Sequence, residues 1–112
     1  MATDLSAISP AAKTQDVALD GTAGNCEEVT LPTWCRRVTI SFVQNDKATA
    51  DAGSIAAAGT DGAAQSDDAM LVGSGGAYEY VVSPNRARNL NGTNIYLAAT
   101  TNTAFARLDM DT

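Results

Sequence analysis

Residues 94–111, NIYLAATTNTAFARLDMD, carry the clearest strand pattern in the chain. This stretch contains two runs in which apolar side chains alternate with others, separated by the polar residues 100–103. Successive side chains of a strand point to opposite faces, so each run presents one apolar face. These faces comprise Ile95, Leu97, Ala99, Ala104, Ala106, Leu108 and Met110. We therefore expect a β-hairpin with one buried face and a turn at residues 100–103.

On the N-terminal side of this stretch, further segments have the composition and alternation of strands. The clearest is 36–44, and the others are 15–20, 26–31, 69–72 and 77–82, with a brief strand near 54–58. The glycine-rich residues 73–76 predict a second hairpin between two of them. Six to eight short antiparallel strands at turn-punctuated spacing indicate an all-β domain, either a compact β-sandwich or a small barrel. We expect one core built from Val38, Ile40, Phe42, Val82, Ile95, Leu97 and Leu108.

Residues 1–14 differ from the rest of the chain. Their only sizeable apolar side chains are Leu5 and Ile8, apart from the first methionine, and Pro10 disfavours a helix through them. We expect an extended N-terminal arm outside the domain formed by residues 15–112. Leu5, Ile8 and Pro10 are candidate contacts to a neighbouring subunit, because extended segments often add a strand to a partner's sheet.

Length and charge narrow the function classes. A chain of 112 residues has room for one core, and its net charge of −6 argues against nucleic-acid and membrane-surface binding. No apolar run has the length of a membrane span, and the first residues lack a secretory signal. Synthesis in a cytoplasm is the expectation, where Cys26 and Cys35 are more often free thiols than a disulfide.

The residues offer little for catalysis. There is no histidine, which excludes Ser-His-Asp and Cys-His sites and removes the commonest zinc ligand. Glu27 and Glu28 are adjacent, so on a strand they point to opposite faces and cannot share a substrate. The glycine-rich residues 73–76 lack the Lys and Ser/Thr of a phosphate-binding loop. We expect no enzymatic activity and no cofactor.

Charged residues segregate along the chain. Segment 45–68 has five aspartates and one lysine, whereas the arginines lie elsewhere. Two interpretations remain open: opposite patches that pair copies or dock on a larger surface, or unrelated solvent-exposed charges. The aspartates are also open to calcium binding, without the spacing of a known loop. The candidate contact residues are Arg36, Arg37, Asp61, Asp67, Asp68, Arg86 and Arg88. Trp34 is either a packing anchor or a ligand-stacking group.

The layout resembles a known family. The residues that carry the resemblance are Val29–Pro32, Arg37–Phe42, Thr60–Gly62, Gly75–Tyr78, Asn94–Ala98 and Phe105–Leu108. Over residues 28–110 this pattern is similar to small virion proteins of tailed bacteriophages. The resemblance implies a compact β-sandwich bound to the outside of a capsid or built into the neck and tail, with no catalytic residues.

Within that class we expect a capsid decoration, or cement, protein. It would be made in the host cytoplasm, bind the major capsid protein or other virion proteins, and act as a homo-oligomer on the particle. One alternative is a neck or tail component, such as an adaptor or tube-associated protein. Another is a carbohydrate-binding or host-recognition module, which would expose the aromatic side chains of Trp34, Tyr78, Tyr80 and Tyr96 as a stacking platform.

Overall fold

The computed structural model describes residues 2–66, 68–82 and 94–112. The described residues form ten strands and one short 3-10 helix, and no α-helix is among these elements. The elements are β1 (Thr3–Asp4), η1 (Pro10–Ala12), β2 (Thr14–Ala18), β3 (Glu27–Thr30), β4 (Arg37–Val43), β5 (Ala50–Asp51), β6 (Gly53–Ala56), β7 (Met70–Val72), β8 (Tyr78–Val81), β9 (Asn94–Ala99) and β10 (Phe105–Asp111).

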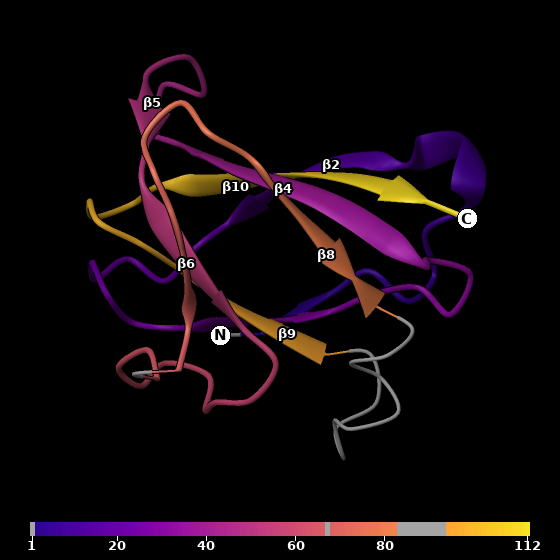
Figure 1. Ribbon diagram of the computed structural model, residues 1–112, viewed down its shortest axis with the longest axis horizontal. Helices are drawn as coiled ribbons and strands as arrows, with labels where there is room; N and C mark the ends of the chain where they lie inside the picture. Colours follow the sequence, from indigo (N-terminus) through magenta and orange to yellow (C-terminus); the bar gives the residue numbers. More distant parts are fainter. Residues whose placement is uncertain (1, 67, 83–93) are drawn as a thin grey trace.

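The strands form two sheets that pack as a β-sandwich (Figure 1). The first sheet has the order β1-β3-β9-β6-β7, and the second has the order β2-β10-β4-β5, with β8 also paired to β4. All pairs are antiparallel except β1 with β3, which is parallel, so the first sheet is mixed. The predicted all-β sandwich is confirmed, and the wholly antiparallel arrangement is corrected at this one edge.

The core lies between the sheets, where alternate side chains of both inner faces meet. All seven predicted core residues belong to a single buried cluster: Val38, Ile40, Phe42, Val82, Ile95, Leu97 and Leu108. The longest pairing runs from Phe105 to Asp111 along the whole of β4. That register places Leu108 opposite Ile40 and Ala106 opposite Phe42, so the apolar faces of β4 and β10 coincide.

The two predicted hairpins are wrong, although their strands and buried faces are right. β9 pairs with β3 and β6, whereas β10 pairs with β2 and β4, so residues 100–104 carry the chain from one sheet to the other (Figure 1). Residues 73–77 make a similar crossing from β7 to β8. Two apolar strands that follow each other in the chain can bury their faces as neighbours in one sheet or as members of two sheets that pack together. Here each pair of strands belongs to two different sheets.

The acidic stretch 45–68 is more ordered than expected. It contains β5 and β6, and Ile55 of β6 is a buried core residue. The following residues fold over the outer face of the first sheet, where Cys26, Ala56 and Tyr96 form a second, smaller buried cluster. Gln65 secures this cover, because its Nε2 donates to the Tyr96 carbonyl at 3.0 Å. Both faces of β9 are consequently buried.

The expected N-terminal arm also needs correction, because its first part packs onto the domain. Thr3 and Asp4 form a parallel pair with Val29 and Thr30, and Leu5 is buried in the main core. Ile8 is partly buried against that core, and its carbonyl accepts a hydrogen bond from Trp34 Nε1 at 2.7 Å. The β1 pairing, the buried Leu5 side chain and the hydrogen bond to Ile8 together fix a segment that has few apolar residues.

Candidate interaction surface

Glu27 and Glu28 lie on opposite faces of β3, as adjacent strand residues must. The Glu27 side chain points inward and is only 4% exposed. Its Oε2 accepts a hydrogen bond from Thr3 Oγ1 at 2.6 Å. Burial raises the pKa of Glu27, and the hydrogen bond from Thr3 opposes this rise. The carboxyl group thus serves to hold β1 against β3.

Glu28 lies on the outer face and has structural partners of its own. Its Oε2 accepts hydrogen bonds from Tyr96 Oη at 2.8 Å and from Asn94 Nδ2 at 3.0 Å. The Glu28 backbone N–H donates to Asp61 Oδ1 at 2.9 Å. Burial acts to raise the pKa of Asp61, but hydrogen bonding outweighs it and lowers that pKa. Asp61, a predicted partner contact, therefore fixes the loop that covers the first sheet.

Asp51 is the most enclosed aspartate in the described residues, at 5% exposure. Its two carboxylate oxygens accept hydrogen bonds from Thr100 Oγ1 and Thr101 Oγ1, each at 2.7 Å, and the Ala52 N–H donates at 2.8 Å. Burial would raise the pKa of Asp51, but these donors outweigh burial and lower it. The interaction ties β5 to the crossing between β9 and β10.

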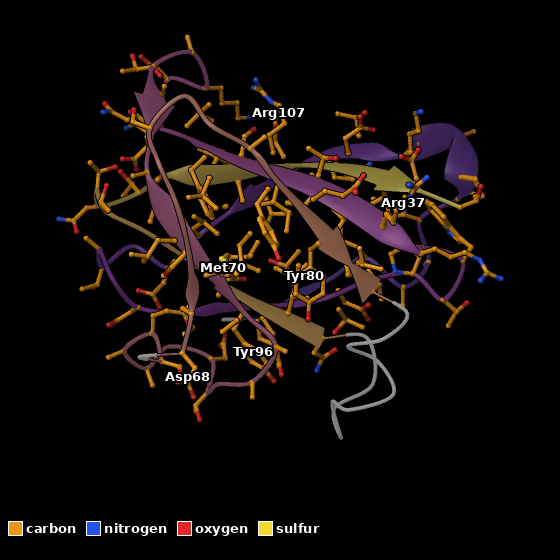
Figure 2. All side chains as sticks on the ribbon, viewed as in Figure 1. Arg37, Asp68, Met70, Tyr80, Tyr96 and Arg107 are labelled. Carbon is orange, nitrogen blue, oxygen red and sulfur yellow. The ribbon has the colours of Figure 1, made fainter. Side chains whose placement is uncertain are left out.

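The labelled acidic and basic contact candidates lie on different parts of the surface (Figure 2). Figure 2 shows Arg37 and Asp68 on different sides of the molecule, and Arg107 on a third. Arg37 Nη1 lies 4.0 Å from Glu79 Oε2, an exposed pair that contributes little to stability. Arg36, Asp68 and Pro10 are exposed. The candidates Asp67, Arg86 and Arg88 lie outside the described residues.

The aromatic side chains proposed as a stacking platform are packed into the domain. Tyr96 and Tyr80 are 1% and 7% exposed, respectively. Tyr78 and Trp34 are partly buried against the main core. The Trp34 indole also holds the N-terminal segment through its hydrogen bond to Ile8. Of the two interpretations of Trp34, the packing anchor is therefore the one that its surroundings fit.

The feature that the sequence did not single out is an exposed apolar edge. Among the described residues, three large apolar side chains are strongly exposed: Met70 at 48%, Leu71 at 82% and Val81 at 40%. They lie on β7, the last strand of the first sheet, and on β8, which borders β4 in the second. We call residues 70–81 the edge segment. It runs across the front of the molecule in Figure 1, from below the β6 label to β8.

A shallow groove adjoins this segment on the outer face of the first sheet. Ser54 faces Leu71 on one side and Ala98 on the other, so the three side chains share that face. Because Ser54 and Ala98 are small, Leu71 stands above its neighbours. The groove is lined by Ala23, Gly24, Gly53, Ser54, Leu71, Ala98, Ala99 and Thr100.

Comparison with known proteins identifies no relative, since no protein-family model, curated protein or solved structure matches this chain. In the part of the chain that the structure describes, no three His, Cys, Asp or Glu side chains are grouped so as to hold a metal ion. Nor do residues 2–66, 68–82 and 94–112 include a helix long and apolar enough to cross a membrane. The edge segment is the most exposed apolar feature of the described residues.

Proposed function

We propose that this chain is a non-enzymatic structural protein of a tailed-bacteriophage virion, of the capsid decoration type. It binds the major capsid protein through the edge segment, residues 70–81. The observation that carries this proposal is the exposure of Met70, Leu71 and Val81 along two sheet edges. Exposed apolar patches mark protein contacts, and an open strand edge can take a further strand by backbone hydrogen bonding.

The remaining side chains support a structural role. The carboxyl groups that are buried or half-buried hold parts of the fold together, as Glu27, Glu28 and Asp51 do. The net charge of −6 favours a partner with a basic surface beside its apolar contact. Because Leu5 belongs to the core, the docking contact is assigned to the edge segment and not to the N-terminal residues.

The alternatives differ in how well they fit. A neck or tail component would use the same edge segment, and only its position on the particle separates it from a decoration protein. A carbohydrate-binding or host-recognition module needs exposed aromatic rings, whereas Tyr80 and Tyr96 are buried. The packing of these rings therefore favours a protein partner over a sugar.

The experiment compares particles assembled with and without this chain. Mass spectrometry of purified particles should find the chain as a stoichiometric component, and a cryo-EM difference map should place it on the outside of the head. Density at the neck or tail would instead support the adaptor alternative. Absence of the chain from purified particles would refute the virion proposal.

Adding the purified protein back to particles that lack it tests the surface. Leu71→Lys and Val81→Lys place a charge at each exposed strand, and either should weaken cosedimentation at least tenfold, or about 1.4 kcal/mol. Ala18→Lys, at an exposed position on β2 in the second sheet, is the matched control and should bind as the unmodified chain does. If all three variants bind particles equally well, the contact with the capsid protein lies outside the edge segment.

A further inference from the structure

The backbone groups of β7 can be assigned to its two sides from the pairings around it. The Thr100 N–H donates to the Ala52 carbonyl at 3.1 Å, so Ala52 directs its backbone groups toward β9. Alternate residues of a strand direct these groups to the same side, so Ser54 also faces β9. Gly53 and Ile55 then bond to β7, where their partners are Val72 and Met70.

This leaves Leu71 with its N–H and carbonyl directed to the open edge. Leu71 is paired in register with Ser54, whose own backbone groups are used on the other side. In the described part of the chain no strand borders β7 beyond Leu71. A two-fold, antiparallel strand pair requires a free donor and a free acceptor on the residue at its axis. At Leu71 of each copy, the N–H would donate to the other copy's carbonyl, and the carbonyl would accept from the other copy's N–H.

The backbone groups on either side of Leu71 are also complementary in this register. Around a two-fold axis at residue 71, residue 69 of one copy lies opposite residue 73 of the other. The Ala69 N–H already donates to Ser66, and the Gly73 carbonyl already accepts from Gly76. The groups left are the Ala69 carbonyl and the Gly73 N–H, which form an acceptor and donor pair across the axis. The edge is therefore self-complementary beyond its central residue.

Charge favours the same orientation. Asp68 precedes β7, and residues 69–73 carry no charge. In an antiparallel pair the two Asp68 residues lie at opposite ends, each near Ser74 of the other copy, whereas a parallel pair would place them side by side. Like charges directly opposite one another destabilise strand pairs. The apolar Leu71 side chains would meet on the outer face of the joined sheet.

We propose that β7 pairs antiparallel with β7 of a second copy of this chain, around a two-fold axis at Leu71. The two first sheets then continue into one sheet across the dimer. This proposal deepens the proposed function and rests on it for the role of the edge segment. On the particle, β8 with Val81 contacts the capsid protein, and β7 strengthens attachment by joining neighbouring copies of the chain. Leu71→Lys therefore weakens particle binding through the loss of the paired copy. An exposed apolar edge strand is an aggregation liability, and pairing covers it.

The dimer should be weak in solution. A contact between such short strands falls well below the roughly 1,200 Å² of a stable specific interface, so we expect a dissociation constant between about 10 μM and 1 mM. Copies held next to each other on a particle would pair more completely, because attachment raises their effective concentration. The measurement must therefore extend to high protein concentration.

Sedimentation equilibrium of the purified chain tests the proposal. The unmodified protein should show a monomer–dimer equilibrium up to about 1 mM. Leu71→Lys should raise the dissociation constant at least tenfold. Leu71→Pro should do the same, because it removes the N–H that faces the edge and the leucine side chain, while Met70 and Val72 keep the N–H groups that pair with β6. Val81→Lys, the matched control on the other exposed strand, should dimerise as the unmodified chain does.

Chemical crosslinking tests the register. Opposed residues in such a pair have Cα atoms about 5.5 Å apart, so a short bis-maleimide should link Leu71→Cys chains into dimers. Val81→Cys should not crosslink, and the native Cys26 and Cys35 are buried in the unmodified chain. A protein that stays monomeric at about 1 mM, or a dimer that Leu71→Lys leaves intact, would overturn the proposal. Neither result bears on whether the chain is found in virions, which particle composition decides.

Discussion

The ring of Phe42 lies against Gly53 across the sandwich. Phe42 belongs to β4 in the second sheet and Gly53 to β6 in the first. A Cβ atom added at Gly53 would lie 2.6 Å from three carbons of the Phe42 ring, closer than real side chains approach. The absence of a side chain at residue 53 therefore sets how near the sheets come at this point, and the largest side chain of β4 fills the space.

Gly53→Ala should lower the free energy of unfolding by about 1–3 kcal/mol, because the added methyl group overpacks the core. Chemical denaturation measures the loss. Gly21→Ala is the control, since a Cβ there meets nothing within 4 Å, and its stability should be unchanged or slightly raised. Adding Phe42→Leu to Gly53→Ala should recover part of the loss. A neutral Gly53→Ala would mean that the sheets are less closely packed at Phe42.

Leu97 provides a second test of the core. Its side chain is fully buried, at 0% exposure, in the middle of β9. Leu97→Ala should lower the free energy of unfolding by about 2–5 kcal/mol, through lost burial and the cavity that remains. Leu71→Ala, at an 82% exposed position, is the matched control and should change stability by less than about 0.5 kcal/mol. A loss of that small size at Leu97 would contradict the register of β9.

The strands and their buried faces could be predicted from the sequence, whereas their pairing could not. Alternation in 94–111 identified Leu97 and Leu108 as core residues, because alternation reports which face is buried. It does not report whether the two runs lie edge to edge or face to face, so the hairpin was the wrong choice for the connection at Thr100. The same ambiguity explains why the edge segment was not predicted. In a β7–β8 hairpin the two strands would pair with each other, and neither would leave these residues at an open edge.

The N-terminal segment and the interaction surface were missed for related reasons. Leu5 lies among small and polar residues, and no periodicity marks a two-residue strand such as β1. The exposure of Leu71 depends on β7 being the last strand of its sheet, which is a property of topology. Asp61 was chosen as a surface charge, and only the folded loop brings it to the Glu28 N–H.

Glu27 gives a pH-dependent prediction. Burial raises its pKa above the ordinary value of 4.5, so its contribution to stability is greatest below that value and is lost as the pH rises through the raised pKa. Glu27→Gln keeps an acceptor for Thr3 and removes the buried charge, so it should stabilise the protein at pH 7 and lose this advantage near pH 4. Thermal melts across this range measure the difference. Glu79→Gln, on the exposed side of β8, is the control. An equal gain in melting temperature for Glu79→Gln would show that the burial of Glu27 is not the cause of the stabilisation.

Asp51 gives a prediction of the opposite sign. Its pKa lies below the ordinary 3.8 because hydrogen bonds to the carboxylate outweigh burial, so its contribution is present above that value and is lost as the pH falls through the lowered pKa. Asp51→Asn should cost about 1–3 kcal/mol at pH 7 and less in acid. Asp109→Asn, at an exposed site on β10, is the control. A loss at Asp51 that is independent of pH would indicate a packing effect and not the charge.

Residues 2–8 should contribute measurably to the stability of the domain. Deleting them removes the β1 pairing, the buried Leu5 side chain and the Ile8 carbonyl that accepts from Trp34. Losing a buried leucine alone costs about 2–5 kcal/mol, so the melting temperature should fall by roughly 8 °C or more in calorimetry. Leu5→Ala should reproduce much of the fall, whereas Pro10→Ala, at an exposed position in η1, should not. An unchanged melting temperature in the deletion would restore this segment to the role of a free arm, available to reach a neighbouring subunit.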